Sequence, residues 1–308
     1  MGMSGMYGAA DEHESIATIH AAMDRGIDLL DTGDFYGAGH NELLIGRAIR
    51  ERRDEVLLSV KFGALRAPGG GWGGIDTRPA AIRNFITYTL TRLGVDHIDI
   101  YRPARLDPNV PIEETVGAIA DLVREGYVRW IGLSEVGPET IRRANAVHPI
   151  VDLQIEYSLV SRGPEAEIFP LLHELGIGAT VYGVLSRGLL SGSSVGGAGD
   201  IRSRMPRFTG ENLERNRALV DTLRSVASEH GVSGTQLAIA WVLSRDPHIV
   251  PLIGARTRAQ LDESFGALDV RLTPDDLARI ERAIPPESVA GTRYDARQMA
   301  ALDSERRG

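Results

Sequence analysis

The sequence predicts a parallel α/β protein that closes into a (β/α)8 barrel (a TIM barrel). Short β-rich runs alternate with longer amphipathic runs along almost the whole chain, and such alternation favours a parallel sheet. Most of the β-rich runs are nearly continuous apolar sequence, as expected for strands covered by helices on both faces. A doubly wound open sheet is the alternative, but it normally carries a glycine-rich phosphate loop after its first strand, and none appears here.

Seven runs have the character of strands, one fewer than a closed barrel requires. They are residues 27–32, 56–62, 97–102, 128–134, 151–157, 178–185 and 249–254. The missing strand would lie at the extreme N-terminus. Residues 1–5 could be the tail of such a first strand, truncated at its beginning.

Helical patterns fill the intervals between these runs and follow the last one. The first of them carries apolar residues at Ile16, Ile19, Ala22 and Met23, the spacing of one helical face. Several open on a proline at a plausible first-turn position. The patterns are residues 12–25, 79–93, 111–125, 138–147, 165–175, 213–230, 235–244, 259–268 and 274–283.

The chain has 308 residues, 43% of them hydrophobic and 25% charged, which suits two ordinary domains or one large barrel. We expect a single barrel domain over residues 1–308 that ends in a C-terminal tail. Residues 294–308 of this tail mix Asp, Glu and Arg, which is typical of a solvated end, although such a tail could also pack over the pocket.

Bulk properties exclude several function classes. The formal net charge of -8 provides no global field that would attract nucleic acid or an anionic membrane. The absence of cysteine rules out disulfides, thiolate catalysis and cysteine metal sites, and it suits a reducing cytoplasm, where we expect the protein. No apolar run approaches the length of a transmembrane helix. The eight histidines are scattered without metal-ligand spacing, so no metal site is expected.

Two segments interrupt the strand–helix rhythm. Residues 67–74 are rich in glycine and contain Trp72, and residues 191–206 are rich in glycine, serine and arginine. Long loops in a compact domain are often functional. We expect the second segment to be a lid because it follows a strand end, whereas the first is equally well explained as a disordered surface loop.

A carboxylate, a phenol and an amine stand at the ends of two successive strand-like runs. Asp31 and Tyr36 belong to Asp-Thr-Gly-Asp-Phe-Tyr-Gly, and Lys61 belongs to Leu-Leu-Ser-Val-Lys-Phe-Gly. A free tyrosine, with a pKa of about 10, is a poor acid at neutral pH, but a nearby ammonium lowers that pKa. The three groups therefore predict a centre that donates a proton to a carbonyl. An ordinary buried ion pair is the structural alternative for Asp31 and Lys61.

These motifs, with four others, resemble those of the aldo-keto reductases over nearly the whole chain. The others are Leu-Asp-Pro-Asn-Val-Pro-Ile-Glu-Glu-Thr, Val-Arg-Trp-Ile-Gly-Leu-Ser-Glu, Gln-Ile-Glu-Tyr-Ser-Leu and Pro-Leu-Ile-Gly-Ala-Arg-Thr. The resemblance implies a (β/α)8 barrel that binds NADPH at the C-terminal ends of its strands and transfers hydride to an aldehyde or ketone. By motif position, Tyr36 would donate the proton, Lys61 would lower its pKa, and Asp31 would pair with Lys61.

One position departs from the family pattern. Aligning on Asp107-Pro108 places Ala104 where the family normally has a histidine. Loss of one well-placed donor to a developing oxyanion typically lowers the rate by about 10²–10³-fold. Arg102 or Arg105 could replace the donor, or the smaller side chain could admit a bulkier substrate.

The resemblance also implies the nicotinamide contacts. Ser134 and Gln154 would hydrogen-bond the carboxamide, and Tyr182 would stack on the ring. Glu135 stands where many relatives have asparagine.

The remaining cofactor contacts are implied by two later segments. The segment that begins at Tyr182 would wrap the pyrophosphate with backbone N–H groups and a guanidinium, and residues 253–257 would bind the 2′-phosphate ahead of a helix. Gln260 and Ser264 replace a common arginine and asparagine, which would weaken the adenosine contacts. The implied contact residues are Gly183, Leu185, Arg187, Gly254, Arg256, Thr257 and, at the adenine, Glu263.

The sequence thus predicts an NADPH-dependent oxidoreductase that reduces an aldehyde or ketone to an alcohol, with a small-molecule substrate and no nucleic-acid or membrane partner. Trp72, Arg102 and Arg105 are the candidates for substrate contacts. Two alternatives stay open: a catalytically weak NADP(H)-binding regulatory or sensor module, and a reductase of an enone, imine or sugar intermediate.

Overall fold

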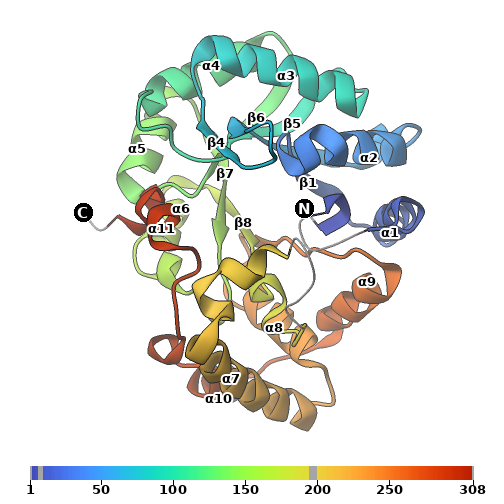
Figure 1. Cartoon of the computed structure of the whole chain (residues 1–308), viewed down its shortest axis with the longest axis vertical. Helices are drawn as coiled ribbons and strands as arrows, with labels where there is room; N and C mark the ends of the chain where they lie inside the picture. The colour runs from blue at the N-terminus through green and yellow to red at the C-terminus, as the bar shows by residue number, and fades with distance from the viewer. Residues whose placement is uncertain (1, 6–9, 194–199, 307–308) are drawn as a thin grey trace.

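The computed structural model describes residues 2–5, 10–193 and 200–306, and its centre is one curled sheet of seven parallel strands (Figure 1). The strands are β1 (Leu29–Gly33), β2 (Leu57–Phe62), β5 (Ile98–Pro103), β6 (Val128–Ser134), β7 (Ile150–Glu156), β8 (Gly178–Tyr182) and β9 (Ile249–Pro251). They lie side by side in chain order, so the strand order never reverses as it would in a doubly wound sheet.

The predicted barrel is confirmed in this open form. Among the described residues, β9 and β1 are the two ends of the sheet and do not pair with each other. The expectation that residues 1–5 continue a strand is wrong for the part that can be described, because Gly2–Ser4 forms a short 3-10 helix.

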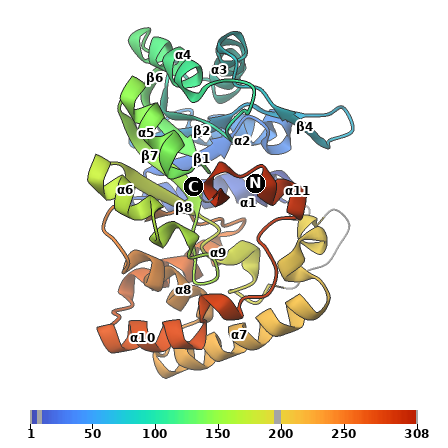
Figure 2. The ribbon, with the colours of Figure 1, turned by 90° about the vertical axis from the view of Figure 1, so that its left-hand side faces the viewer.

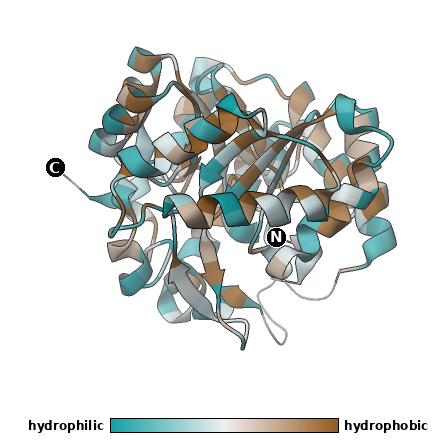
Figure 3. Cartoon of the chain, turned by 90° about the horizontal axis from the view of Figure 1, so that it is seen from above, coloured by the Kyte–Doolittle hydropathy of each residue, from teal (hydrophilic) through white to brown (hydrophobic). Residues whose placement is uncertain are grey.

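Helices surround the sheet, and apolar residues concentrate along the central strands (Figure 3). All nine predicted helical patterns are present, three with the predicted bounds and six with ends shifted by at most three residues, but α2 and α11 were not predicted. The helices are α1 (Glu12–Asp24), α2 (His40–Ile49), α3 (Pro79–Leu93), α4 (Ile112–Arg124), α5 (Pro138–Val147), α6 (Ile168–Leu175), α7 (Gly210–Glu229), α8 (Gly234–Leu243), α9 (Arg258–Phe265), α10 (Pro274–Ala283) and α11 (Ala296–Ala300). No helix in the described part of the chain is long and apolar enough to span a membrane.

Local sequence explains where several helices begin and end. The side chain of Asp11 accepts a hydrogen bond from the Glu14 N–H at 2.7 Å and so caps α1. Ser233 and Gln236 form a reciprocal capping box at the start of α8. Helix α3 opens on Pro79 and stops at Gly94, whose φ of 69° is the left-handed conformation that glycine tolerates best.

The glycine-rich segment after β2 is an ordered hairpin and not a disordered loop. Strands β3 (Ala64–Arg66) and β4 (Trp72–Ile75) pair antiparallel, and the hairpin projects from the rest of the molecule (Figure 2). The second predicted loop lies only partly within the described residues. Its described part contains two 3-10 turns, Ile201–Arg204 and Pro206–Phe208.

The C-terminal tail packs against the carboxyl ends of the strands. The Asp303 carboxylate accepts a hydrogen bond from the Gly137 N–H at 2.8 Å, and the Ser304 N–H donates to the Glu135 carbonyl at 3.2 Å. Gly137 and Glu135 lie between β6 and α5, more than 160 residues earlier in the chain than their partners in the tail. The tail is therefore not a purely solvated end.

Candidate active site

A buried ion pair joins the ends of the first two strands. Lys61 Nζ lies 2.5 Å from Asp31 Oδ2, and the Lys61 residue is only 4% exposed. Ser59 Oγ and Gln154 Nε2 donate hydrogen bonds to Asp31 Oδ1 at 2.9 and 2.7 Å. Burial alone would raise the pKa of the Asp31 carboxyl, but the charges of Lys61 and Arg102 outweigh it and hold that pKa below its ordinary value.

Burial lowers the pKa of the Lys61 ammonium, while its ion pair with Asp31 opposes this effect. The ammonium also lies 5.2 Å from the centre of the Tyr36 ring. Tyr36 is buried on the turn after β1, where the Phe35 ring packs edge-on against it with 4.7 Å between the two ring centres. Gly33 makes room for this turn, since an added Cβ would lie 3.0 Å from the Phe35 ring. The structure thus brings together the carboxylate, the amine and the phenol that the sequence singled out.

Asp34, on the same turn, is an acid whose charge the fold disfavours. Burial raises the pKa of its carboxyl to about 7, although the Gly63 N–H donates to Oδ2 at 3.3 Å. The other oxygen, Oδ1, has no hydrogen-bond partner among the described residues. Between pH 3.8 and about 7 the native state therefore holds a proton at Asp34 that the unfolded chain has already lost.

We expect Asp34→Asn to stabilise the protein more at alkaline than at acidic pH. A raised native pKa contributes stability that is full below pH 3.8 and is lost as pH rises through about 7. Because asparagine does not ionise, the variant should gain up to roughly 4 kcal/mol relative to the parent across that window. Urea unfolding of both proteins at about pH 5 and about pH 8.5 measures the difference; an identical difference at the two pH values would contradict the assignment.

Ala104 leaves no donor at the position where a histidine is common. It is buried beyond β5, and its N–H donates to the Phe62 carbonyl at 2.8 Å. The neighbouring Arg105 is half-buried and donates to the Ala104 carbonyl at 2.6 Å. No carboxylate in the described ranges lies within ion-pair distance of this guanidinium. Burial acts to lower the pKa of Arg105, but Tyr182, Tyr294 and Glu135 outweigh it and raise that pKa.

Arg102 does not line an open pocket. Its side chain is 0% exposed inside the sheet, where it forms an ion pair with Asp152 and hydrogen bonds with Thr180 Oγ1 at 3.1 Å and Ser59 Oγ at 2.9 Å. Its partners are all protein groups, so the structure gives no support to a direct substrate contact of Arg102, and that contact stays a prediction. Trp72 is 58% exposed on the hairpin, so its predicted substrate contact stays a prediction.

Ser134, Gln154 and Tyr182 lie at the carboxyl ends of neighbouring strands, with Ser134 opposite Gln154 in the register. Ser134 Oγ is buried and has no hydrogen-bond partner among the described residues. The Tyr182 hydroxyl donates to Glu135 Oε1 at 2.9 Å and lies 3.0 Å from the Tyr294 hydroxyl. The described strand ends therefore offer one polar group without a partner, on β6, and one aromatic ring, on β8.

A dense ionic cluster links these strand ends to the tail. Arg293 donates to both oxygens of the buried Glu135 at 2.9 and 2.7 Å, and Arg187 pairs with Glu156 at 2.8 Å while lying 4.6 Å from the Tyr294 ring. No sequence motif pointed to Arg293 or Tyr294, because Glu135 and Tyr182, which they contact at the strand ends, lie more than 100 residues earlier in the chain. Glu135, which replaces a common asparagine, thus holds the tail.

The residues expected at the pyrophosphate and adenosine lie on two later segments. Gly183 has a φ of 70°, and an added Cβ there would lie 3.0 Å from Glu156; Leu185 is partly buried in the same segment. Thr257 caps α9, and the Arg256 N–H donates to the Gln260 side chain at 2.8 Å.

Gly254 is exposed just ahead of that helix, and Glu263 accepts a hydrogen bond from Ser233 at 2.9 Å. Their roles toward a cofactor stay predictions.

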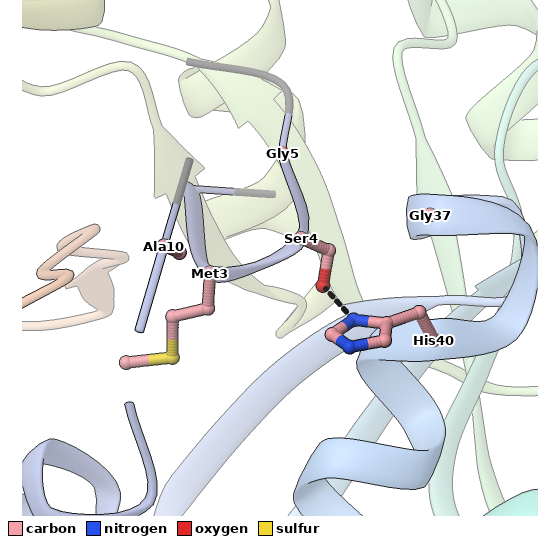
Figure 4. A pocket seen from close by; sticks show the side chains of 6 residues that line it. All are labelled: Met3, Ser4, Gly5, Ala10, Gly37 and His40. Carbon is pink, nitrogen blue, oxygen red and sulfur yellow. Dashed lines mark hydrogen bonds between the residues drawn. The ribbon is translucent and has the colours of Figure 1, made fainter. Parts of the chain in front are cut away.

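A cavity of about 370 Å³ lies beside the turn that carries Tyr36 (Figure 4). Ser4 and His40 face each other across its edge, with Ser4 Oγ 3.1 Å from His40 Nδ1. The cavity is lined by Met3, Ser4, Gly5, Ala10, Gly37 and His40.

One group of possible metal ligands escaped the sequence patterns, because its members come from two separate segments. The ligand atoms of His173, Asp246 and His248 lie within 4.8 Å of one another. Both imidazoles are exposed, and His248 Nδ1 lies 3.0 Å from Asp246 Oδ1, so an ordinary surface hydrogen bond accounts for two of the three groups.

Comparisons with known proteins place this arrangement in a family. A family model described as "Aldo/keto reductase family" matches residues 1–285. The chain belongs to the aldo/keto reductase family. It is 42% identical over 299 residues to a probable aldo-keto reductase 1 of Glycine max, an alignment that covers 96% of this chain and 86% of that protein.

Solved structures agree with this assignment. The glycerol dehydrogenase AKR11B4 of Gluconobacter oxydans superposes with a TM-score of 0.82 at 31% identity, covering 92% of this chain and 89% of that one. An aldo/keto reductase of Klebsiella pneumoniae, solved with NADP and acetate, gives 0.71 at 26% identity, with 92% and 89% covered. This aldo/keto reductase is therefore an NADP-dependent oxidoreductase of a family that acts on small carbonyl compounds.

Proposed function

We propose that this enzyme reduces the carbonyl group of a small aldehyde or ketone to an alcohol, with Tyr36 as the proton donor. The observation that carries the proposal is the contact of the buried Lys61 ammonium with both Asp31 and the Tyr36 ring. A positive charge next to a phenol favours its phenolate and lowers the pKa of the hydroxyl. The adjacent carboxylate of Asp31 cancels part of that effect, so Asp31 sets both the position and the strength of the charge.

The residues at the strand ends suit a nicotinamide. The Ser134 Oγ, which has no partner among the described residues, is proposed to hydrogen-bond the carboxamide, and the Tyr182 ring to stack on the nicotinamide. When bound, NADPH supplies the hydride that reduces the carbonyl carbon. The Tyr36 hydroxyl gives its proton to the carbonyl oxygen, Lys61 stabilises the resulting phenolate, and solvent returns a proton to Tyr36.

Because Ala104 has no side-chain donor, either another residue donates to the carbonyl oxygen or the reaction is slower. We propose Arg105 for this role, since its guanidinium has no carboxylate partner in the described part of the chain and follows the strand next to Lys61. Arg187 and Arg256 are proposed to bind the phosphates of the cofactor. For Arg187 this requires the guanidinium to share or exchange its present partner, Glu156.

The direct test is NADPH oxidation across a panel of aldehydes and ketones, with the alcohol product identified and NADH run in parallel. We expect substrate-dependent oxidation with at least one carbonyl class. Tight NADPH binding without turnover of any substrate would instead favour the cofactor-binding regulatory module, which Ala104 motivates. A reduced C=C or C=N bond in the products would identify the enone or imine alternative.

A further inference from the structure

A second buried cation, Arg102, lies next to Lys61, the residue proposed to lower the pKa of Tyr36. Arg102 is on β5, whose register places it directly opposite Lys61 on β2. Its side chain is fully buried, and it is held from the far side by an ion pair with Asp152 on β7. Asp152 is itself fixed by the Thr180 N–H at 2.7 Å and the Thr180 hydroxyl at 2.9 Å. The guanidinium thus has a rigid anchor.

From this anchor a chain of hydrogen bonds leads to the active centre. Arg102 Nη2 donates to Ser59 Oγ at 2.9 Å, and Ser59 Oγ donates to Asp31 Oδ1 at 2.9 Å. Asp31 in turn holds Lys61 through its other oxygen. Because Arg102 occupies the acceptor side of the Ser59 hydroxyl, that hydroxyl is oriented to donate to Asp31. Gln154 Nε2 donates a second hydrogen bond to the same Asp31 oxygen at 2.7 Å, so Ser59 and Gln154 together orient this carboxylate.

The sequence makes room for this arrangement at one glycine. A Cβ added at Gly132, on β6, would lie 3.2 Å from Arg102 Cζ and 3.0 Å from the Ile100 side chain. A residue with a side chain at this position would therefore require the guanidinium and the Ile100 side chain to shift. The buried arginine and the facing glycine form a matched pair of residues.

The charged groups around the pair come from each adjoining element. The cations that act on Lys61 are Arg102, on β5, and Arg105, beyond the end of that strand. The anions of the network are Asp31 and Asp152. Asp34 is a further acid, on the turn that carries Tyr36. Arg102 lowers the pKa of both Asp31 and Lys61. Removing its charge makes the local potential more negative, which disfavours the phenolate of Tyr36 and raises its pKa.

We propose that Arg102 is a positioning residue for the reduction, acting through Ser59 to orient Asp31 and, through Asp31, Lys61. The proposal rests on the function proposed above for Tyr36 and Lys61. It assigns Arg102 no contact with substrate or cofactor. Its role is to keep the ammonium aimed at the phenol and to add a second positive charge behind it.

Two variants test the proposal. Ser59→Ala removes only the bridging hydroxyl and leaves the Arg102–Asp152 pair intact, whereas Arg102→Met combined with Asp152→Asn removes the pair without stranding a charge. We expect the double variant to lose at least about tenfold in kcat, equivalent to about 1.4 kcal/mol, with the KM for NADPH unchanged. Arg102, but not Asp152, is among the charges that act on both Asp31 and Lys61, so the loss of its charge should dominate in the double variant. Since the acid must be protonated, the alkaline limb of the pH–rate profile should then move to higher pH, and Ser59→Ala should shift it in the same direction by less.

Arg53→Met is the matched control. Arg53 pairs with the buried Asp99 at 2.7 Å, but that pair has no hydrogen bond to Asp31, and Asp99 keeps Arg129 as a partner. It should lower stability without moving the pH–rate limb. If Ser59→Ala folds and keeps the parent's kcat and pH profile, the inference is overturned, even if the double variant does not fold. An equal shift of the pH–rate limb in Arg53→Met would also overturn it. Turnover by the parent and its loss in Tyr36→Phe test the proposed function separately.

Discussion

Replacing Tyr36 by phenylalanine is expected to lower kcat by about 10²–10⁴-fold, the usual contribution of a positioned general acid. Phenylalanine keeps the ring that contacts Phe35 and Lys61 and removes only the hydroxyl. NADPH binding should therefore stay near the parent level, because the ring and the Asp31–Lys61 pair are preserved. Steady-state turnover with the best carbonyl substrate and a fluorescence titration with NADPH measure the two effects.

Phe35→Leu is a suitable control, since it perturbs packing on the same turn without removing a proton donor. If Tyr36→Phe retained the parent rate, another group would have to supply the proton. Arg105 would then be a poor alternative acid, because its neighbours raise its pKa, and the proposed mechanism would fail as a whole.

Arg293→Met should be the most destabilising single change at the tail. Arg293 is buried and neutralises Glu135, which is 0% exposed. Removing one partner of a buried ion pair typically lowers the free energy of unfolding by about 3–5 kcal/mol, because the other charge stays buried without compensation. Urea unfolding measures the loss, and limited proteolysis shows whether the tail or the whole barrel opens.

The double change Glu135→Gln with Arg293→Met should recover part of this loss, because it removes the stranded carboxylate. Arg142→Met, which breaks an exposed pair with Glu174, should change the unfolding free energy little. Recovery that fails in the double variant would show that packing, and not charge, holds the tail.

The pH dependence of the Arg293→Met effect follows from Glu135. Burial would raise the pKa of this carboxyl, but Arg293, Arg105 and Ser304 outweigh it and hold the pKa at about 2. A depressed pKa contributes stability that is present above the unfolded value of 4.5 and is lost as pH falls toward about 2. The gap between the parent and Arg293→Met should therefore narrow over that acidic range.

The fold was predictable because parallel strands covered by helices produce a strong local pattern of apolar runs. Features without such a pattern were missed. Helix α2 follows the tight turn of Gly37 and Ala38, both with left-handed backbone conformations, and this turn reads as a loop in the sequence. The β3–β4 hairpin is rich in glycine, which conceals the alternation typical of strands.

At the site, motif positions located Asp31, Tyr36 and Lys61, because short-range spacing places them at neighbouring strand ends. The spacing of residues along the sequence does not determine the direction in which a side chain points. Arg102 and Arg105 are close in sequence, yet one is enclosed in the sheet and the other lies beyond the strand end. Only the tertiary pairing of Arg102 with Asp152 decides between these positions.

The attachment of the tail has a practical consequence for anyone who engineers this enzyme. Arg293, Ser304 and Glu305 form one connected set with Glu135 at the mouth of the barrel. A shortened version that stops at the end of α10 would expose polar strand ends that now have partners, so it would not be a minimal catalytic core. Affinity tags and fusion partners at this end need a flexible spacer, because Arg293, Ser304 and Glu305 are held by direct bonds to Glu135 or to one another.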